Sequence, residues 1–287
     1  MINNSNQPNI IAHRVKQGLK RIPNIKNIIA VTSGKGGVGK STTAFNLALG
    51  LANQGLKIGI LDADIYGPSL PLLIGATDYK PEVSPNNRFV PLEKFGMKAM
   101  SFGFLVDSNQ ATIWRGAIVN KALEQMLFDT EWGDLDILVI DMPPGTGDIH
   151  LTIGQKMPIT ATIVVTTPQD IALIDVGKSI AMFEKLAIPC LGVVENMALH
   201  ICSNCGHLEH TFGQGANEKL KQRYQLDLLA QLPLNSLICE LSDAGNPLDL
   251  HPQLREIYTQ LAIQTLGKLS QLPKDYATLI PNIQVVK

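Results

Sequence analysis

One short run of residues constrains this chain more than any other, because it fits the phosphate-binding loop pattern G-x-x-x-x-G-K-[ST]. The run extends from Gly34 to Thr42 and reads GKGGVGKST. Apolar, β-branched residues at 28–32 predict a buried parallel strand before it. Helically spaced apolar residues within 43–52 predict a helix after it. A phosphate loop requires this setting between strand and helix, so the sequence predicts a nucleoside triphosphate site.

Each part of this loop has a physical role in holding phosphate groups. Its glycines let backbone N–H groups turn inward around the phosphate oxygens, and the start of the following helix adds a partial positive charge. Lys40 is expected to reach the β- and γ-phosphates, and the Ser41 hydroxyl to hold Mg²⁺. The predicted nucleotide-binding residues of the loop are Gly34, Lys35, Gly36, Gly37, Val38, Gly39, Lys40, Ser41 and Thr42.

Two other predicted strands, 57–62 and 135–141, end in carboxylates. The carboxyl ends of parallel strands lie beside the phosphate loop, where the metal must be. We therefore expect Asp141 to be the Walker B residue, Asp64 to orient or activate the attacking water, and Asp62 to support the metal shell. A single aspartate at a strand end is also a common helix N-cap, so the prediction is stronger for the set than for each member.

A second lysine, Lys35, stands where the general loop pattern accepts any residue. The stretch KGGVGKS resembles the deviant Walker A class of dimeric ATPases. In that class the extra lysine reaches the partner subunit's nucleotide and neutralises developing charge, as an arginine finger does. The resemblance implies a homodimer, and Lys35 joins Lys40 and Asp64 as an expected catalytic residue.

The base of the nucleotide is predicted to be adenine. A guanine site usually carries N-K-x-D, and the one Asn-Lys pair in the chain, Asn120-Lys121, lacks the aspartate. Asn196 follows a predicted strand and is positioned like the asparagine that contacts the base in the deviant Walker A class. The alternative for Asn196 is an ordinary turn residue at a strand end.

Cysteines supply the second chemical signal. Of the four in the chain, Cys202 and Cys205 form a C-x-x-C pair, whereas Cys190 and Cys239 stand alone and are expected to be core or incidental thiols. A single pair suits a redox dithiol, half a zinc site or half an iron–sulfur site. Zinc and cubane clusters usually take four protein ligands, so two chains related by a two-fold axis would supply the full set.

Two rival interpretations of the cysteine pair are weaker. A zinc site within one chain would recruit His200, His207 or His210, but the spacing between the cysteines and His207 is too short for a typical finger. A thioredoxin-like pair opens a helix, whereas Gly206 and the histidine-rich stretch after it predict a loop.

With both signals described, the chain resembles the Mrp/ApbC family of iron–sulfur cluster carrier ATPases. The resemblance covers most of the chain from about 26 to 247 and rests on residues 34–43, ILDADIYGPSL at 60–70, IDMPPGTGD at 140–148, VTTPQDIALID at 165–175 and VENMALHICSNCGH at 194–207. It implies ATP hydrolysis, a labile cluster, usually [4Fe–4S], held between two subunits by Cys202 and Cys205, and its transfer to apo iron–sulfur proteins. Many bacterial members carry a small domain before the ATPase; the stretch here is too short for such a core.

The expected fold class is α/β, a P-loop NTPase with a mostly parallel sheet and helices on both faces. Its 287 residues and 45% hydrophobic content suit one large core. We expect an extension at 1–24, partly disordered, a domain at 25–268 and a surface tail at 269–287. Further predictions are strands at 161–166 and 188–194, a strand end at 231–234, a helix from about 171 to 185, and a short amphipathic helix at 10–20 with His13 facing outward.

Composition argues against several partners. The net charge is −1 with no dense Lys/Arg run, so no nucleic acid is expected. No run is long enough to span a membrane, no signal peptide is present, and prolines interrupt the tail where a membrane-binding helix would be basic and amphipathic. A cytoplasmic location is predicted. The alternatives are a positioning or partitioning ATPase with a zinc-bridged dimer, and a reductase resembling the nitrogenase iron protein, whose cluster ligands lie at separate sites.

Overall fold

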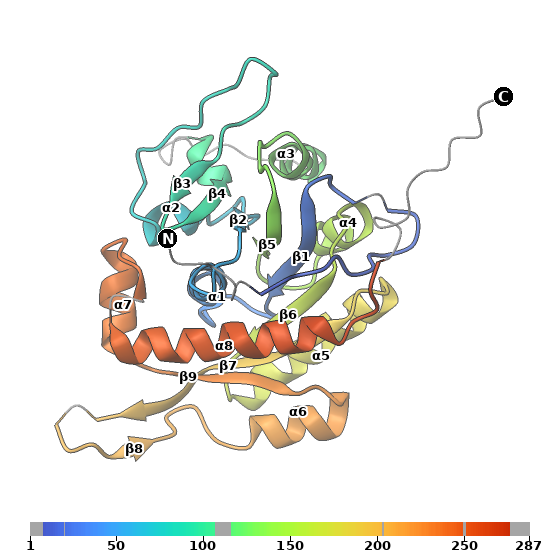
Figure 1. Ribbon diagram of the computed structural model, residues 1–287. Coiled ribbons are helices and arrows are strands. Elements are labelled where there is room, and N and C mark those ends of the chain that lie inside the picture. The colour runs from blue at the N-terminus through green and yellow to red at the C-terminus, as the bar shows by residue number, and fades with distance from the viewer. Residues whose placement is uncertain (1–7, 20, 107–115, 203, 249–250, 276–287) are drawn as a thin grey trace.

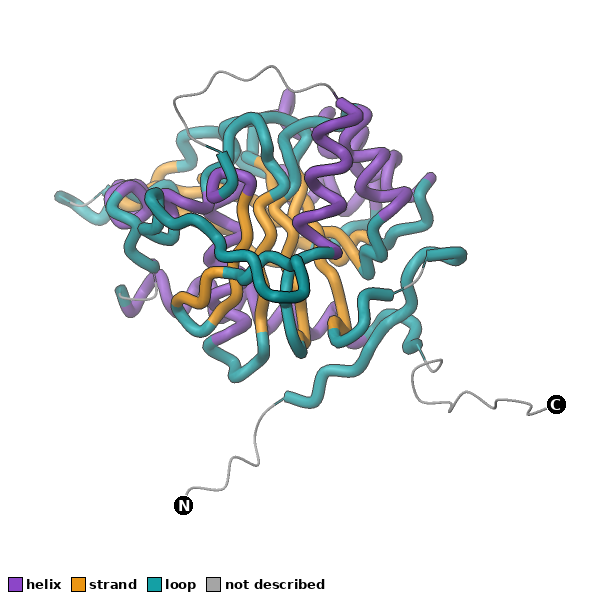
Figure 2. Tube along the Cα trace, turned by 90° about the horizontal axis from the view of Figure 1, so that it is seen from above, coloured by secondary structure: helices purple, strands orange, loops and turns teal. Residues whose placement is uncertain are grey.

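A mostly parallel sheet forms the centre of the molecule, with helices on both sides (Figures 1 and 2). The computed structural model describes residues 8–19, 21–106, 116–202, 204–248 and 251–275. The strand order is β3-β4-β2-β5-β1-β6-β7-β8, and β9 pairs with β7. The strands are β1 (Ile25–Thr32), β2 (Ile58–Asp62), β3 (Leu92–Lys94), β4 (Met97–Ser101), β5 (Leu135–Asp141), β6 (Ala161–Thr166), β7 (Cys190–Ile201), β8 (Leu208–Glu209) and β9 (Leu228–Pro233).

The helices follow the strands in the alternating order expected of an α/β protein. They are α1 (Lys40–Ala52), α2 (Leu70–Leu73), the 3₁₀ turn η1 (Phe102–Phe104), α3 (Gly116–Phe128), α4 (Asp148–Lys156), α5 (Asp170–Lys185), α6 (Ala216–Tyr224), α7 (Ser236–Asp243) and α8 (Pro252–Ser270). The expected fold class and the predicted order of strands and helices around the phosphate loop are confirmed.

The central strands are buried along almost their whole length. Every residue of β2 and β6 is buried, as are all but one each of β1 and β5. Strands covered by helices on both faces must be apolar on both, which is why they are continuous hydrophobic runs in the sequence. They pair in parallel, so that their carboxyl ends, including Asp62 and Asp141, lie at one edge of the sheet.

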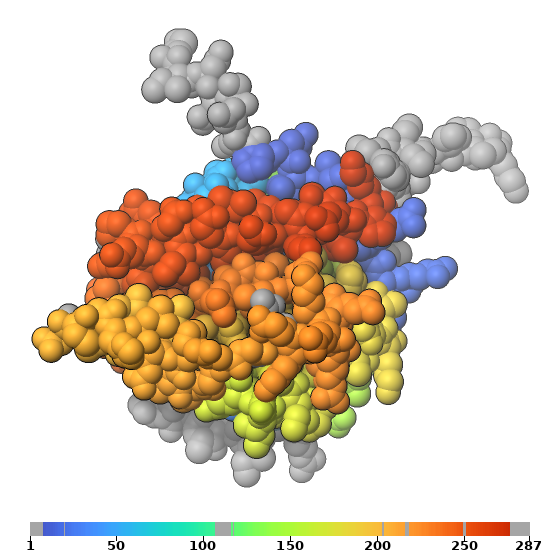
Figure 3. All heavy atoms as spheres, turned by 90° about the horizontal axis from the view of Figure 1, so that it is seen from below, coloured from blue at the N-terminus to red at the C-terminus, as the bar shows by residue number. Residues whose placement is uncertain are grey.

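Helix α1 packs closely against the long C-terminal helix. A methyl group at Gly50 would lie 2.7 Å from the main-chain oxygen of Tyr258, so only glycine allows the two helices to approach this far. Helix α8 (red-orange) extends across the face seen in Figure 3, beside the segment from β7 to β9 (gold to orange). On the α5 and α6 side a separate apolar cluster joins them to β6 and β7: Val164, Leu173, Val176, Ile180, Val193 and Leu220.

The predicted helix at 10–20 is wrong. The described part of this segment, 8–19, contains no helix, and His13 is buried rather than outward-facing. Its backbone N–H and ring Nδ1 both lie within hydrogen-bond distance of Asn27 Oδ1, at 3.0 and 3.1 Å. His13 also forms an antiparallel bridge with Lys274. The extended segment thus gains its backbone partners from β1 and the chain end, a tertiary effect that overrides local periodicity.

Two other boundaries differ from expectation. Strand β7 begins at Cys190 instead of 188 and continues to Ile201, seven residues beyond the predicted end. Helix α8 extends to Ser270, so the expected domain boundary at 268 falls within its last turn. Of the expected tail at 269–287, residues 276–287 lie outside the described residues, so its position on the surface stays a prediction.

Candidate nucleotide site and cysteine hairpin

A cleft of about 560 Å³ lies over the phosphate loop at the carboxyl edge of the sheet. The loop, Asp64, Pro144 and Asn196 form its phosphate end, and residues 233–243, from β9 and α7, form its far wall. Carboxyl-end crevices of parallel sheets are the usual ligand sites of this architecture. The cleft therefore contains the predicted loop and one of the three predicted carboxylates directly.

Lys40 and Asp141 form a buried ion pair behind the loop. Lys40 Nζ also donates to Ser41 Oγ at 3.2 Å. Burial raises the pKa of Asp141, while the charge and hydrogen bond of Lys40 and a hydrogen bond from Ser41 oppose that rise. The lysine, the hydroxyl and the carboxylate are thus together, as Mg²⁺ and phosphate binding would require.

Asp62 is fully buried one strand away from this pair. It is the register partner of Asp141 in β5 and of Ser101 in β4. Its Oδ2 accepts hydrogen bonds from Ser101 Oγ at 3.0 Å and from the Leu70 N–H at 3.1 Å. Burial, then the charge of Asp141, raises the pKa of Asp62 to about 7. Burial thus favours the neutral acid form of this carboxyl.

Asp64 lines the cleft and is half-buried. One carboxylate oxygen accepts a hydrogen bond from the Gly67 N–H at 3.2 Å, and its own N–H donates to Asp62 Oδ1 at 3.1 Å. These bonds fix the turn after β2. The geometry is compatible with the expected contact to an attacking water.

The phosphate loop is held from outside by Asn196. Its Nδ2 donates to the main-chain oxygen of Val38 at 2.8 Å. The next loop residue, Gly39, has a φ of 77°, and a methyl group there would lie 2.1 Å from Asn196 Nδ2. Glycine is therefore required at 39 both by the left-handed backbone and by the approach of the amide.

Lys35 lies at the other end of the loop, beside α5. Its Nζ donates to Gln169 Oε1 at 3.0 Å, and it also contributes to the cleft. A methyl group at the preceding Gly34 would come within 2.4 Å of Asp175 Cβ, so the loop starts in close contact with α5. The structure therefore places Lys35 between its own nucleotide cleft and the molecular surface.

Helix α4, which follows the loop after β5, carries a residue that sequence reasoning missed. Gly145 donates its N–H to the main-chain oxygen of Ser33 at 3.0 Å, which ties this loop to the residue before the phosphate loop. His150, in α4, is buried, hydrogen-bonds the backbone of Pro143, and has no partner at Nε2. Burial lowers its pKa to about 4, and nearby Lys40 adds to that effect. A neutral imidazole thus supports the loop from beneath.

Cys202 and Cys205 lie at the turn between β7 and β8, which project from the body of the molecule (Figure 1). The turn is closed by hydrogen bonds from the Cys202 N–H to the His207 oxygen and from the Gly206 N–H to the Cys202 oxygen, both 2.9 Å. Cys205 is exposed and Cys202 half-exposed. Hydrogen bonds from the backbone of Cys205 and Asn204 lower the pKa of the Cys202 thiol, which favours the thiolate that binds metals.

The other candidate ligands do not join this pair. His200 Nδ1 lies 3.1 Å from the Leu234 oxygen, and His210 Nδ1 lies 2.9 Å from the Ala198 oxygen. Among the described residues, no three His, Cys, Asp or Glu side chains are grouped to hold a metal ion. The zinc site within one chain is therefore not formed. Each chain offers two sulfurs.

The two isolated cysteines have different surroundings. Cys190 is half-buried at the start of β7, where burial raises the pKa of its thiol to about 11. Cys239 is exposed on α7 at the wall of the nucleotide cleft, so of the two expected alternatives, core or incidental thiol, it is not a core thiol. Its Sγ lies 3.5 Å from Asp243 Oδ2, and this hydrogen bond raises the pKa of the thiol.

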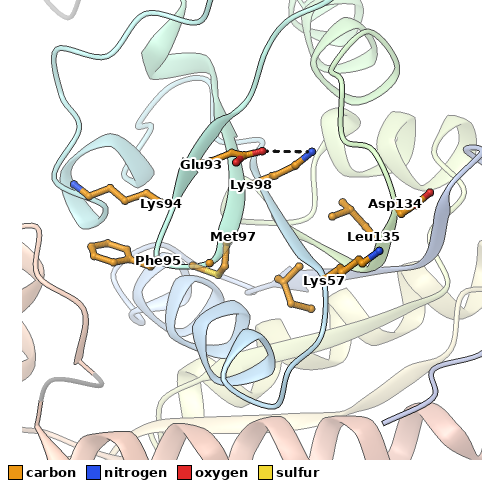
Figure 4. A pocket seen from close by; sticks show the side chains of 10 residues that line it. Lys57, Glu93, Lys94, Phe95, Met97, Lys98, Asp134 and Leu135 are labelled. Atoms are coloured by element: carbon orange, nitrogen blue, oxygen red, sulfur yellow. Dashed lines mark ion pairs between the residues drawn. The ribbon is translucent and has the colours of Figure 1, made fainter. Parts of the chain in front are cut away.

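A second hollow of about 560 Å³ lies at the opposite, amino edge of the sheet (Figure 4). Three lysines surround it, but Lys98 pairs with Glu93 at 3.6 Å and Lys94 donates to the Gly75 oxygen at 2.9 Å. It contains no residue of the phosphate loop. The carboxyl-edge cleft therefore remains the candidate site.

Sequence reasoning also missed Ser101 and Gln169. Ser101 ends β4, a five-residue strand, and its hydroxyl meets Asp62 only across the sheet. Gln169 is within the stretch VTTPQDIALID, but its contact with Lys35 joins residues 134 positions apart. The sequence shows only that a polar residue stands at or shortly after the end of a strand. It does not show that Ser101 contacts Asp62 or that Gln169 contacts Lys35.

A membrane-spanning helix is not found among the described residues. Comparison with known proteins gives a specific match. The family model described as ParA, NUBPL iron-transfer P-loop NTPase, matches residues 24–266. An iron–sulfur cluster carrier protein of Pseudomonas fragi is 53% identical over 258 residues, covering 88% of this chain and 90% of that protein. One from Escherichia coli K12 is 53% identical over 260 residues, covering 88% and 70%.

More distant relatives agree. The mouse iron–sulfur cluster transfer protein NUBPL is 48% identical over 260 residues, covering 89% of this chain and 81% of its own. A nucleotide-binding protein from Archaeoglobus fulgidus, solved with ADP and containing Co, has a TM-score of 0.73 and 39% identity, covering 83% of this chain and 94% of that chain. The Pyrococcus furiosus cell division ATPase MinD, at 21% identity, shares the fold with a TM-score of 0.62, covering 84% and 98%. The chain belongs to the family of NUBPL iron-transfer P-loop NTPases.

Proposed function

We propose that this protein is an ATP-hydrolysing iron–sulfur cluster carrier that works as a homodimer and delivers its cluster to apo iron–sulfur proteins. The observation that carries the proposal is the course of β7, which passes Asn196 at the phosphate loop and ends at the turn holding Cys202 and Cys205. Cys202 follows Asn196 by six positions, and the strand between them is irregular: Met197 has a φ of 56°, and the pairing with β9 shifts register between Glu195 and Leu199. One strand therefore connects the nucleotide site to the turn that carries the sulfur ligands.

The roles in ATP hydrolysis follow from the side chains around the cleft. Lys40 would bind the β- and γ-phosphates, and Ser41 with Asp141 would hold Mg²⁺. Asp62 would support the metal shell from behind, and Asp64 would orient the attacking water. Lys35 of each subunit would reach the partner's nucleotide. Lys40 and Asp141 contact each other directly, so the phosphate and cation ligands of the proposed site lie side by side.

The cluster is cargo held between two chains. Two half-exposed or exposed sulfurs per chain, on a projecting turn, suit a site completed by a second copy across a two-fold axis. Exposed Ile201 and Leu208 flank the cysteines, and their burial in a dimer would exclude water from the cluster. A [4Fe–4S] cluster fits the four thiolates. Transfer to an apo-protein needs an accessible, labile site, which the position at the turn provides.

A cytoplasmic location and no nucleic acid or membrane partner complete the proposal. The alternative is a positioning or partitioning ATPase with a zinc-bridged dimer. Zinc is equally satisfied by four thiolates, so the favoured function depends on which metal the cysteine pairs take.

The test is anaerobic purification followed by reconstitution with iron and sulfide, with iron and zinc measured per chain beside the visible spectrum. For the wild type we expect about two irons per chain and a broad charge-transfer band. The double variant Cys202→Ala/Cys205→Ala should lose both and still bind ATP. The matched control is Cys190→Ala/Cys239→Ala, which removes two thiols elsewhere and should keep the cluster. Zinc at about half an atom per chain, with no cluster formed, would favour the alternative.

A further inference from the structure

The lysine that distinguishes this loop is bound to its own subunit. Lys35 Nζ donates to Gln169 Oε1 at 3.0 Å, and both side chains are half-buried. If Lys35 serves the partner's nucleotide, this contact has to break when the dimer forms. Gln169 therefore competes with the second copy for Lys35.

The Gln169 side chain has no part in capping its helix. The residue is the N-cap of α5, but its side chain makes no capping hydrogen bond. Its main-chain oxygen accepts from the Ala172 N–H at 2.9 Å, so the helix start is supported by the backbone. An N-cap glutamine is not among the residues that favour this position. The side-chain contact that the structure gives Gln169 is the one with Lys35.

The bond between Lys35 and Gln169 is suited to release. The acceptor is a neutral amide, and it lies at a helix N-terminus, where the helix dipole disfavours a cation. The nearest acidic residues of α5 are paired elsewhere, Asp170 with Lys219 and Asp175 with Lys178. Within the described parts of the chain, Lys35 forms no ion pair.

The same helix presents an apolar surface beside this contact. Ile171 is 67% exposed and Ile174 is 55% exposed, both within the first two turns of α5. A second copy that covers these side chains would also meet Gln169. Gly34 packs directly against Asp175, so a second copy seated on α5 would lie close to the start of the phosphate loop.

We propose that Gln169 is a positioning residue that holds Lys35 on its own subunit until a second copy engages α5, and so sets the protein concentration at which ATP hydrolysis begins. The inference rests on the proposed dimeric ATPase. Weakening the Lys35–Gln169 hydrogen bond lowers the free energy needed to form the active dimer, and strengthening it raises that free energy. The rate of the assembled dimer does not depend on Gln169.

The test is the rate of phosphate release per chain, measured over a wide range of protein concentrations at saturating Mg²⁺ and ATP. Gln169→Ala removes the acceptor and should lower the half-activating protein concentration by roughly three- to tenfold. Gln169→Glu replaces the neutral acceptor with a carboxylate and should raise it by a similar factor. The plateau rate should stay within about twofold, as expected of a residue that acts before the transition state forms.

Gln222→Ala, on exposed α6, is the matched control and should leave the profile unchanged. Sedimentation velocity with a non-hydrolysable ATP analogue gives a second readout, since the dimer fraction should move in the same order. The inference alone is overturned by either of two results. In the first, the wild-type rate per chain rises with protein concentration but neither Gln169 variant shifts the half-activating concentration. In the second, Gln169→Ala raises that concentration. A wild-type rate per chain independent of concentration, with monomers throughout, overturns the dimeric ATPase and the inference together.

Discussion

The side-chain amide of Asn196 donates a hydrogen bond to the main-chain oxygen of Val38, with the two atoms 2.8 Å apart. Val38 lies in the phosphate loop, and Asn196 lies in β7, 158 residues later in the chain. A side chain at position 39 would collide with this amide, so the approach of Asn196 to the loop depends on glycine at 39. Asn196 thus has a role in shaping the loop, beside the predicted contact with the base.

The Asn196→Ala variant separates these two roles. Loss of the bond to Val38 should loosen the loop and weaken binding of every nucleotide by about 1 kcal/mol, or roughly fivefold. Titration with fluorescent ATP and GTP analogues measures both affinities. A similar loss for the two bases supports the loop role. A loss for ATP alone would favour the base contact and leave Val38 without energetic importance.

Much of the fold is predictable because its strands are buried on both faces. Such strands are continuous apolar runs, so 57–62, 135–141 and 161–166 are visible in the sequence, and their terminal carboxylates mark the site. The short pair β3 and β4 gives no such signal, because β3 has three residues and none is fully buried. Strand β4 is mostly buried but has only five residues, MKAMS, and Lys98 interrupts its apolar run, so Ser101 at its end was missed.

Contacts between distant segments were not predictable. The wrong helix at 10–20 has the local spacing of an amphipathic helix, but its backbone partners come from Asn27 and the chain near Lys274. Likewise Gln169 is an ordinary residue before a helix until Lys35 is brought to it by folding. Periodicity reports which faces are buried and carries no information about which segment buries them.

Lys40→Ala should abolish hydrolysis while the fold is kept. The variant loses the cation that would contact the phosphates, and removal of one such contact costs at least about 100-fold in rate. It also leaves Asp141 buried without its partner, and burial in the absence of a cation disfavours the charged carboxylate. Phosphate release and far-ultraviolet circular dichroism test the two halves of the prediction. Lys57→Ala, at the opposite edge of the sheet, is the control, and normal turnover by Lys40→Ala would overturn the site.

Asp62 should make the nucleotide-free protein less stable as pH rises. Its folded pKa of about 7 is above the unfolded value of 3.8. The folded state therefore binds more protons in this window, so the stabilisation present below the unfolded pKa is lost as pH rises through 7. Relative to Asp62→Asn, the wild type should lose on the order of 1–3 kcal/mol of unfolding free energy between pH 5 and 8.

Urea unfolding of both proteins at several pH values measures this difference, with the exposed Asp78→Asn variant as control. Addition of Mg²⁺ and ATP should reduce the slope, because a cation nearby favours the ionised carboxylate. Parallel curves for wild type and Asp62→Asn would mean that Asp62 has the same charge in both states.

His150 should produce the opposite dependence at lower pH. Its folded pKa of about 4 is below the unfolded value of 6.5, so the unfolded state binds more protons between these values. Stability contributed by the neutral imidazole is present above 6.5 and is lost as pH falls towards 4. Replacement by glutamine, which does not titrate, should reduce the acid sensitivity by roughly 2–3 kcal/mol between pH 7 and 4. Urea unfolding of wild type and His150→Gln across this range measures the effect. The exposed His207→Gln is the control, which should follow the wild type.

The same residue should affect nucleotide binding, because His150 hydrogen-bonds the backbone of Pro143 beneath the loop after β5. As pH falls from 7 to 4, the nucleotide affinity of the wild type should fall more than that of His150→Gln. Equal acid sensitivity of the two proteins would show that the imidazole is already charged, or reached by water, in the folded state.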